Sequence, residues 1–203
     1  VSACTSPNYY LEIDHALYYL TGDAGAGVWH GEGAKFLGFT GSVFKEQLIA
    51  AFNGLGSDFY TRHVQLPKGR NRQPAWDITF SAPKSVSVLW SLLAADDRHK
   101  IETLVMQATK RAIDYLDAKA LLTRRGKGGQ AVEHAKGVYA LCPHGTSRSQ
   151  DPQLHVHALA INMCVREDGS TGTIRSKDLY HHKMAAGAIF RLELASLLTK
   201  QLG

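Results

Sequence analysis

One pair of adjacent β-strands constrains the fold more than any other feature. Residues 137–142 and 154–161 are almost entirely apolar or aromatic, which is typical of strands. Residues 145–152, which join them, are rich in Gly, Ser, Asp and Pro, the residues that dominate turns. We therefore expect the two segments to pair as an antiparallel hairpin.

Three histidines lie at the turn end of this predicted hairpin. His155 and His157 are two residues apart, so their side chains leave the same face of the strand, separated by roughly 6.5 Å of rise. His144 precedes the turn and would lie beside them. Three neutral imidazoles leave coordination positions for water or substrate, as in catalytic metal sites. The alternative, ordinary half-buried strand residues, is disfavoured by the ligand-type spacing.

Composition fits one globular domain. The chain has 203 residues, of which 44% are hydrophobic, enough for a sizeable core. We expect a cytoplasmic protein, because there is no apolar run long enough to span a bilayer and no basic-then-apolar leader. Cys4, Cys142 and Cys164 are odd in number without a CxxC spacing, so we expect reduced thiols that fill space.

Positive charge is concentrated after residue 60. The formal net charge of +5 divides into −4 for residues 1–60 (2 Lys or Arg, 6 Asp or Glu) and +9 for residues 61–203 (21 and 12). Loops that carry several Lys and Arg residues suit the binding of an anionic polymer, although a run of charged residues is often only a solvated surface. The candidate DNA-binding residues are Arg62, Lys68, Arg70 and Arg72 in one loop and Arg148 in the predicted hairpin turn.

The remaining pattern mixes strands with helices. Residues 76–81 alternate, which places Trp76, Ile78 and Phe80 on one face and Asp77 on a polar face. Apolar spacing predicts helices over 42–52, 83–93, 97–119 and 178–202, and short strands near 121–124 and 132–140. Ser42 and Ser81 are the predicted helix starts, and Gly54 a predicted stop. These elements predict an α+β fold, a central and largely antiparallel sheet with packed helices in two layers or a sandwich.

Half of the chain's eight tyrosines lie in the first nineteen residues, as the pairs Tyr9-Tyr10 and Tyr18-Tyr19. Aromatic packing is one explanation. The other is nucleophilic: a phenol with a pKa of about 10 needs a nearby cation or base, which a metal site with a spare carboxylate supplies. Tyr9 and Tyr18 would lie on opposite faces of one unbroken helix, so they could not share a metal ion that way.

Four segments, in order, closely resemble motifs of the MobF class of conjugative relaxases (TraI/TrwC-like), which belong to the HUH endonuclease superfamily. They are Asn8-Tyr-Tyr10, Tyr18-Tyr19, Asp77 to Ser87 (DITFSAPKSVS) and His144 to His157, and the resemblance extends to the last helix. Members cut one strand of plasmid DNA at the transfer origin, stay joined to the new 5′ phosphate through a tyrosine, and later rejoin the strand.

The resemblance implies roles for the motif residues. His144, His155 and His157 would hold one divalent ion, and Tyr9 would be the leading nucleophile. Asp77 would serve either as the base for the phenol or as an orienter of an imidazole.

Other motif residues receive secondary roles from the same resemblance. Tyr10, Tyr18 and Tyr19 match further family tyrosines, the later pair of which performs a second transfer in some relatives. Lys84 and Arg148 would contact phosphate, and we expect Lys84 to be buried at its helix start.

The resemblance also implies a cofactor and partners. Phosphoryl chemistry predicts Mg²⁺ or Mn²⁺ in function, and imidazole ligands allow Zn²⁺ or Ni²⁺ as occupants. The expected partners are single-stranded transfer-origin DNA and accessory conjugation proteins. We expect a bacterial monomer, with residues 1–203 forming one relaxase domain that lacks the C-terminal part closing over DNA in relatives.

Three rival functions involve a similar metal site. HUH replication initiators and transposases normally have the nucleophile after the histidines, where this chain has only Tyr180. A non-enzymatic DNA-binding module would use the ion structurally, which an open site disfavours. A metallohydrolase would attack with metal-bound water and leave no protein on the DNA.

Overall fold

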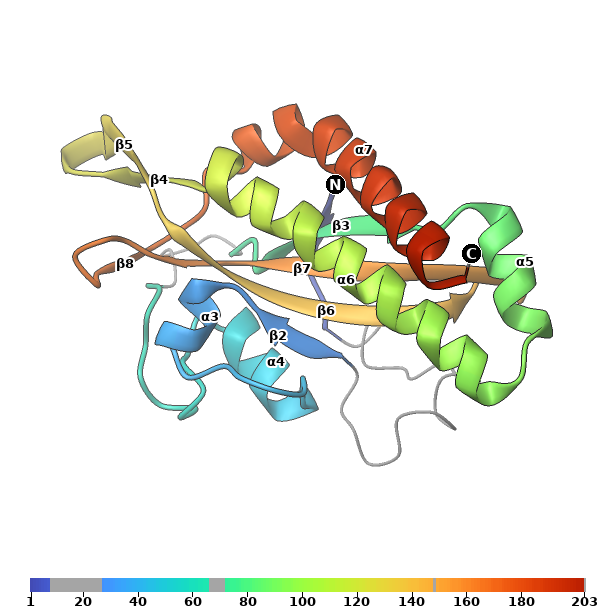
Figure 1. Ribbon diagram of the computed structural model, residues 1–203. Coiled ribbons are helices and arrows are strands. Elements are labelled where there is room, and N and C mark those ends of the chain that lie inside the picture. The colour runs from blue at the N-terminus through green and yellow to red at the C-terminus, as the bar shows by residue number, and fades with distance from the viewer. Residues whose placement is uncertain (8–26, 66–71, 148, 203) are drawn as a thin grey trace.

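Figure 1 shows the computed structural model of the chain, which describes residues 1–7, 27–65, 72–147 and 149–202. A central sheet has the strand order β1-β3-β7-β6-β2, with β8 paired to β7, and every pair is antiparallel. Its strands are β1 (Ser2–Cys4), β2 (Val28–His30), β3 (Ala75–Ser81), β6 (Lys136–Thr146), β7 (Pro152–Val165) and β8 (Thr171–Gly172). A separate ribbon pairs β4 (Leu122–Arg125) with β5 (Ala131–His134), joined by a short 3₁₀ turn.

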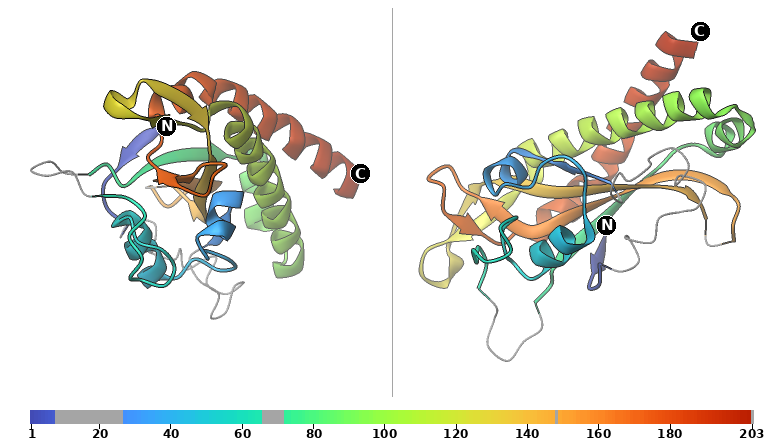
Figure 2. Two further views of the ribbon diagram at one scale, coloured as in Figure 1. Left: turned by 90° about the vertical axis from the view of Figure 1, so that its left-hand side faces the viewer. Right: turned by 90° about the horizontal axis from the view of Figure 1, so that it is seen from below.

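Helices cover both faces of this sheet. One face carries α6 (Ala95–Ala120) and α7 (Ser176–Leu202), which pack side by side, and α5 (Lys84–Leu92) at the hairpin end. The short helices α3 (Glu32–Phe36) and α4 (Lys45–Phe52) lie on the opposite face (Figure 2). The predicted α+β fold with a largely antiparallel sheet is therefore confirmed, as a sandwich of helices around one sheet.

The strands divide their side chains between two apolar cores. Trp76, Ile78 and Phe80 pack beneath α6 and α7, as their alternation predicts. The opposite face of β3 carries Asp77, Thr79 and Ser81, as predicted, and Thr79 and Ser81 are exposed. Asp77 itself is only 6% exposed, because this end of the face meets the second core under α3 and α4. Its carboxylate therefore needs a partner inside the protein.

Helix starts differ from the prediction more than helix stops do. Ser42 forms a bridge with Val28, and α4 begins at Lys45 without a side-chain cap. Ser81 is the last residue of β3, and α5 follows Pro83, also without a side-chain cap. Gly54 ends α4 as predicted, because its φ of 74° suits glycine where the chain reverses.

Several short elements and one strand break were not predicted. The elements β1, β2, α3, β8 and the 3₁₀ turn (Lys127–Gly129) have only two to five residues each, too few to display a period. The predicted strand 132–140 is divided at Ala135 between β5 and β6, which belong to different sheets. The long helices and the hairpin strands were predicted correctly, apart from one or two residues at helix ends and longer hairpin strands.

The hairpin turn lies between Thr146 and Pro152, so it is shorter than the predicted segment 145–152, whose Gly145 and Pro152 belong to the strands. Ser147 closes it: its N–H donates to the carbonyl of Asp151 at 2.9 Å, and its Oγ accepts the N–H groups of Ser149 and Asp151 at 3.2 and 3.3 Å. This closure fixes the two strand ends that carry the histidines.

All three cysteines are buried, and Cys142 and Cys164 are free thiols, as expected. Burial, with Asp77 nearby, raises the pKa of the Cys142 thiol to about 12, so this thiol remains protonated at neutral pH. No helix in the described part of the chain is long and apolar enough to cross a membrane.

Candidate metal centre

Strand register brings the three histidines together. His144 on β6 lies directly opposite His155 on β7, and His157 follows two residues later on the same face. One ligand nitrogen from each ring lies within 4.8 Å of those of the other two. His155 and His157 are buried and His144 is half-buried. The predicted grouping of the three imidazoles is thus present.

Asp77 fixes the ring of His157. Its Oδ2 lies 2.8 Å from Nδ1 of His157, so Nδ1 carries the proton and donates it to the carboxylate. Thr79, directly opposite His157 in the sheet, donates its hydroxyl to Oδ1 of Asp77 at 3.2 Å. The sequence had not singled out Thr79, although it shares the alternation that placed Asp77 on this face. The Nε2 lone pair of His157 is left facing the other rings.

His155 is oriented in the same way by a backbone oxygen. Its Nδ1 lies 2.7 Å from the carbonyl of Gln153, which again favours the tautomer protonated at Nδ1. The Nε2 atoms of His155 and His157 are therefore both acceptors, and they lie 3.2 Å apart. Two lone pairs at this distance repel each other unless a cation lies between them.

The distance between these two nitrogens fits a shared metal ion. With metal–nitrogen bonds of about 2.1 Å, a separation of 3.2 Å corresponds to an angle of about 100° at the metal, between octahedral and tetrahedral values. His144 adds a third imidazole from the neighbouring strand. Donor type, tautomer and spacing all suit a divalent ion held by three neutral nitrogens.

Lys84 does not occupy the buried position expected for it. It is the exposed first residue of α5, and its Nζ donates to the carbonyl of Pro152 at 2.8 Å. Pro152 begins β7, three residues before His155, so the ammonium group lies at the turn end of the hairpin. Phosphate contact by Lys84 remains a prediction, now for an exposed cation.

Arg62 and Arg72 lie at the other end of β7. Arg72 is half-buried and donates to the carbonyls of Phe52 and, at 2.7 Å, Asn162; Arg62 donates to the carbonyl of Asn53 at 3.0 Å. Burial and the nearby Arg62 lower the pKa of Arg72 to about 10. Asn162 is five residues from His157, or roughly 17 Å along the strand, so DNA contacts predicted here would be far from the metal.

The other predicted site residues lie outside the described part of the chain. These are Tyr9, Tyr10, Tyr18, Tyr19, Lys68, Arg70 and Arg148. Their roles stay predictions.

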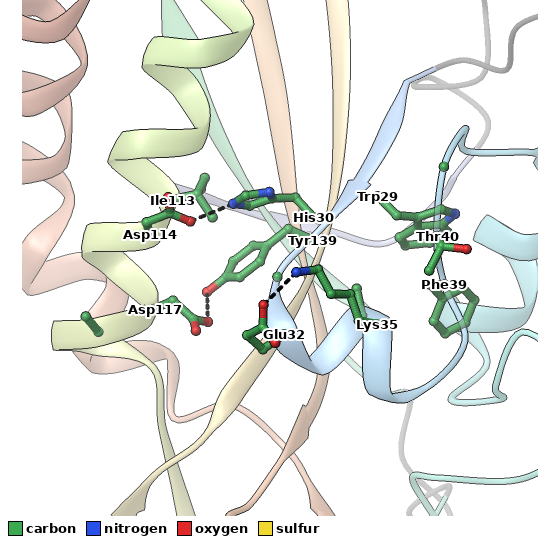
Figure 3. Close-up of a pocket in the computed structure, with 14 residues that line it drawn as sticks. Trp29, His30, Glu32, Lys35, Phe39, Thr40, Ile113, Asp114, Asp117 and Tyr139 are labelled. Carbon is green, nitrogen blue, oxygen red and sulfur yellow. Dashed lines mark hydrogen bonds and ion pairs between the residues drawn. The ribbon is translucent and has the colours of Figure 1, made fainter.

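A separate cavity of about 320 Å³ lies between α6 and the β2–α3 segment (Figure 3). Its polar groups pair with one another: His30 Nε2 with Asp114 Oδ1 at 2.7 Å, and Tyr139 with Asp117 at 3.0 Å. Glu32 adds a third carboxylate to the lining. An acidic cavity whose groups are already paired is poorly suited to a polyanion such as DNA.

Asp117 beside this cavity gives a test of stability against pH. Burial raises its pKa, although it accepts the N–H of Gly137 and the hydroxyl of Tyr139. The folded state therefore binds a proton more tightly than the unfolded state, so Asp117 lowers stability as pH rises above the ordinary value of 3.8. Asp117→Asn keeps an accepting oxygen without titrating.

We expect the unfolding free energy of Asp117→Asn, relative to the wild type, to increase between pH 4 and pH 7. Urea denaturation at the two pH values measures this difference. An equal difference at both values would contradict the proposed burial effect.

This chain is similar in sequence to known proteins. A model of the TrwC relaxase family matches residues 4–203. The multifunctional conjugation protein TraI of Escherichia coli (strain K12) is 35% identical over 211 residues, which cover 95% of this chain and 11% of TraI. Another Escherichia coli TraI is 34% identical over the same proportions.

Solved structures extend the comparison to three dimensions. A copper-bound complex of the conjugative relaxase TrwC with oriT DNA aligns with a TM-score of 0.83 and 31% identity, covering 97% of this chain and 66% of TrwC. A metal-bound TrwC complex with oriT DNA gives 0.77 and 31%, covering 93% and 65%. The chain therefore spans just under two thirds of these TrwC chains and a small part of TraI.

Proposed function

Because this chain belongs to the TrwC relaxase family, we propose that it nicks and rejoins one strand of DNA at a plasmid transfer origin during conjugation. The observation that carries the proposal is the cluster of His144, His155 and His157, in which Asp77 orients the ring of His157. Three imidazole ligands leave coordination positions for substrate. The TrwC relatives have been solved with oriT DNA and with metal, which supports the same substrate and a divalent ion here.

The proposed reaction is a transesterification by Tyr9. The three histidines would hold the ion, which when bound draws charge from the non-bridging oxygens of a phosphodiester and fixes the phosphorus for in-line attack. The phenol oxygen of Tyr9 forms a bond to phosphorus, its proton leaves to a base, and the bond to the 3′ oxygen breaks and yields a 3′ hydroxyl. One phosphoester replaces another, so rejoining needs no ATP.

Asp77 is proposed to be the orienter rather than the base. Its Oδ2 already accepts the Nδ1 proton of His157, and its Oδ1 accepts the hydroxyl of Thr79. A carboxylate that orients a ligand imidazole raises the basicity of that imidazole and fixes its tautomer.

Tyr10, Tyr18 and Tyr19 are proposed as further family tyrosines, of which the later pair would serve a second transfer.

Other parts of the proposal concern the ion, the DNA and the cell. We propose Mg²⁺ or Mn²⁺ in function, with Zn²⁺ or Ni²⁺ as alternative occupants. The DNA contacts are proposed to come from Arg62, Lys68, Arg70, Arg72, Lys84 and Arg148, of which Lys84 contacts the first residue of β7. The chain would act as a monomeric relaxase domain in the bacterial cytoplasm with accessory conjugation proteins.

Incubation with a single-stranded transfer-origin oligonucleotide and Mn²⁺ tests the function. We expect a protein–DNA adduct that survives denaturing electrophoresis and disappears when a chelator is added first. A free 5′ phosphate without adduct would instead indicate a metallohydrolase. Binding without any cleavage at saturating Mn²⁺ would indicate a non-enzymatic DNA-binding module.

A further inference from the structure

Helix α5 lies against the end of the sheet that carries the histidines (Figure 1). Its buried face presents Ser87, which is 0% exposed, and Trp90, which is 3% exposed. Residues three apart share one face of a helix, so both side chains point into the same contact. Each of them touches the backbone next to a metal-centre histidine.

Ser87 completes the ladder between β3 and β7. The carbonyl of Leu154 accepts the N–H of Ala82 at 2.9 Å, but the chain then turns into α5 at Pro83. The carbonyl of Ala82 accepts the side chain of Gln153 at 3.3 Å. The N–H of Leu154 instead donates to Oγ of Ser87 at 3.0 Å, and this hydroxyl donates to the carbonyl of Pro83 at 3.3 Å.

This hydrogen bond is adjacent to a metal ligand. Leu154 immediately precedes His155, so the position of its N–H sets the backbone from which the imidazole extends. A buried N–H seldom remains unpaired, and the serine hydroxyl is the group that pairs it. Ser87 thereby fixes β7 at its first buried residue.

Trp90 supports the neighbouring strand. A Cβ atom on Gly145 would lie 2.5 Å from Cη2 of Trp90, so the ring packs directly against the backbone that follows His144. The strand register shifts between His144 and Thr146, at this same residue. The indole Nε1 donates to Oε1 of Glu102 on α6 at 2.8 Å, which fixes the ring.

We propose that Ser87 and Trp90 are positioning residues for the metal centre, Ser87 acting on His155 and Trp90 on His144. The His157 ring is also held by Asp77 and the His155 ring by the carbonyl of Gln153, so each histidine has a support, and Ser87 and Trp90 supply theirs from one helix face. The inference rests on the proposed role of the histidines as metal ligands.

Ser87→Ala tests the first contact, with Ser91→Ala as the matched control. Ser91 lies on the same helix and donates its hydroxyl to the carbonyl of Val88 at 2.8 Å, a hydrogen bond within α5 itself. The signal of free Mn²⁺ in electron paramagnetic resonance measures the dissociation constant of each folded variant. We expect Ser87→Ala to weaken Mn²⁺ binding about 10-fold, because residues that hold a metal ligand in place typically contribute at least this much to metal affinity. Ser91→Ala should leave Mn²⁺ binding unchanged.

Activity at high metal concentration separates positioning from general damage. Nicking by Ser87→Ala should recover when Mn²⁺ is raised to saturation, because the ligands themselves remain. Equal Mn²⁺ affinity of Ser87→Ala and Ser91→Ala would overturn the Ser87 assignment.

Gly145→Ala tests the second contact and does not depend on the folding of Ser87→Ala. We expect it to weaken Mn²⁺ binding, and Trp90→Phe in the same chain to restore much of the affinity by removing the ring atoms that the new methyl group meets. Failure of this rescue would overturn the Trp90 assignment. His157→Ala distinguishes failure of the positioning roles from failure of the metal site. Unchanged Mn²⁺ binding in this variant would refute the proposed metal site itself.

Discussion

Tyr9→Phe is expected to abolish the covalent adduct while leaving DNA binding intact. Phenylalanine keeps the ring but lacks the oxygen that would bond to phosphorus, so attack has no nucleophile. Removal of a covalent nucleophile typically costs about 10⁴-fold or more in rate. An oligonucleotide labelled at its 3′ end reports the adduct on a denaturing gel, because the 5′ phosphate of the downstream product is the end that joins the tyrosine.

Tyr18→Phe is the control for this prediction, since it makes the same change in the second tyrosine pair. We expect the first adduct to form at close to the wild-type rate, with fluorescence anisotropy confirming equal DNA binding by both variants. An adduct in Tyr9→Phe, or one that disappears only in Tyr18→Phe, would reverse the ranking of the tyrosines.

His157→Ala is expected to have the second large effect. It removes one of three ligands and also leaves the buried carboxylate of Asp77 without its imidazole donor. We expect Mn²⁺ affinity and the initial nicking rate each to fall by about 100-fold or more. Wild-type affinity in a variant that remains folded would exclude His157 as a ligand.

Two substitutions of Asp77 separate its alternative roles. Asn can still accept the Nδ1 proton of His157, whereas Ala cannot. If Asp77 orients the ring, Asp77→Ala should weaken Mn²⁺ binding more than Asp77→Asn does. If Asp77 is instead the base, both variants should lose nicking while Asp77→Asn binds Mn²⁺ normally.

The grouping of the three histidines was predictable because it depends on a local rule. Alternation along a strand puts His155 and His157 on one face, and a turn-rich segment brings His144 beside them. The same alternation places Asp77 on the correct face of β3. These relations need only the strand period and the pairing of neighbouring strands.

Other features depend on contacts between distant segments, which no local pattern reveals. The carbonyl partners of Arg72 come from α4 and from β7, so its partial burial could not be read from a run of charges. Lys84 was expected to be buried at its helix start, yet it is exposed and the buried face of α5 belongs to Ser87 and Trp90. Serine at that position has no signature in hydrophobic spacing.

The position of β7 in the sheet has a consequence for the dynamics of the metal centre. β7 lies between β3 and β6, so His155 and His157 are in an interior strand rather than at an edge, where opening of a sheet usually begins. Amide hydrogen exchange at these two residues should therefore report global unfolding. An ion that enters or leaves the proposed site would then do so without opening of the strand, so that the three histidines would keep their arrangement with or without the ion.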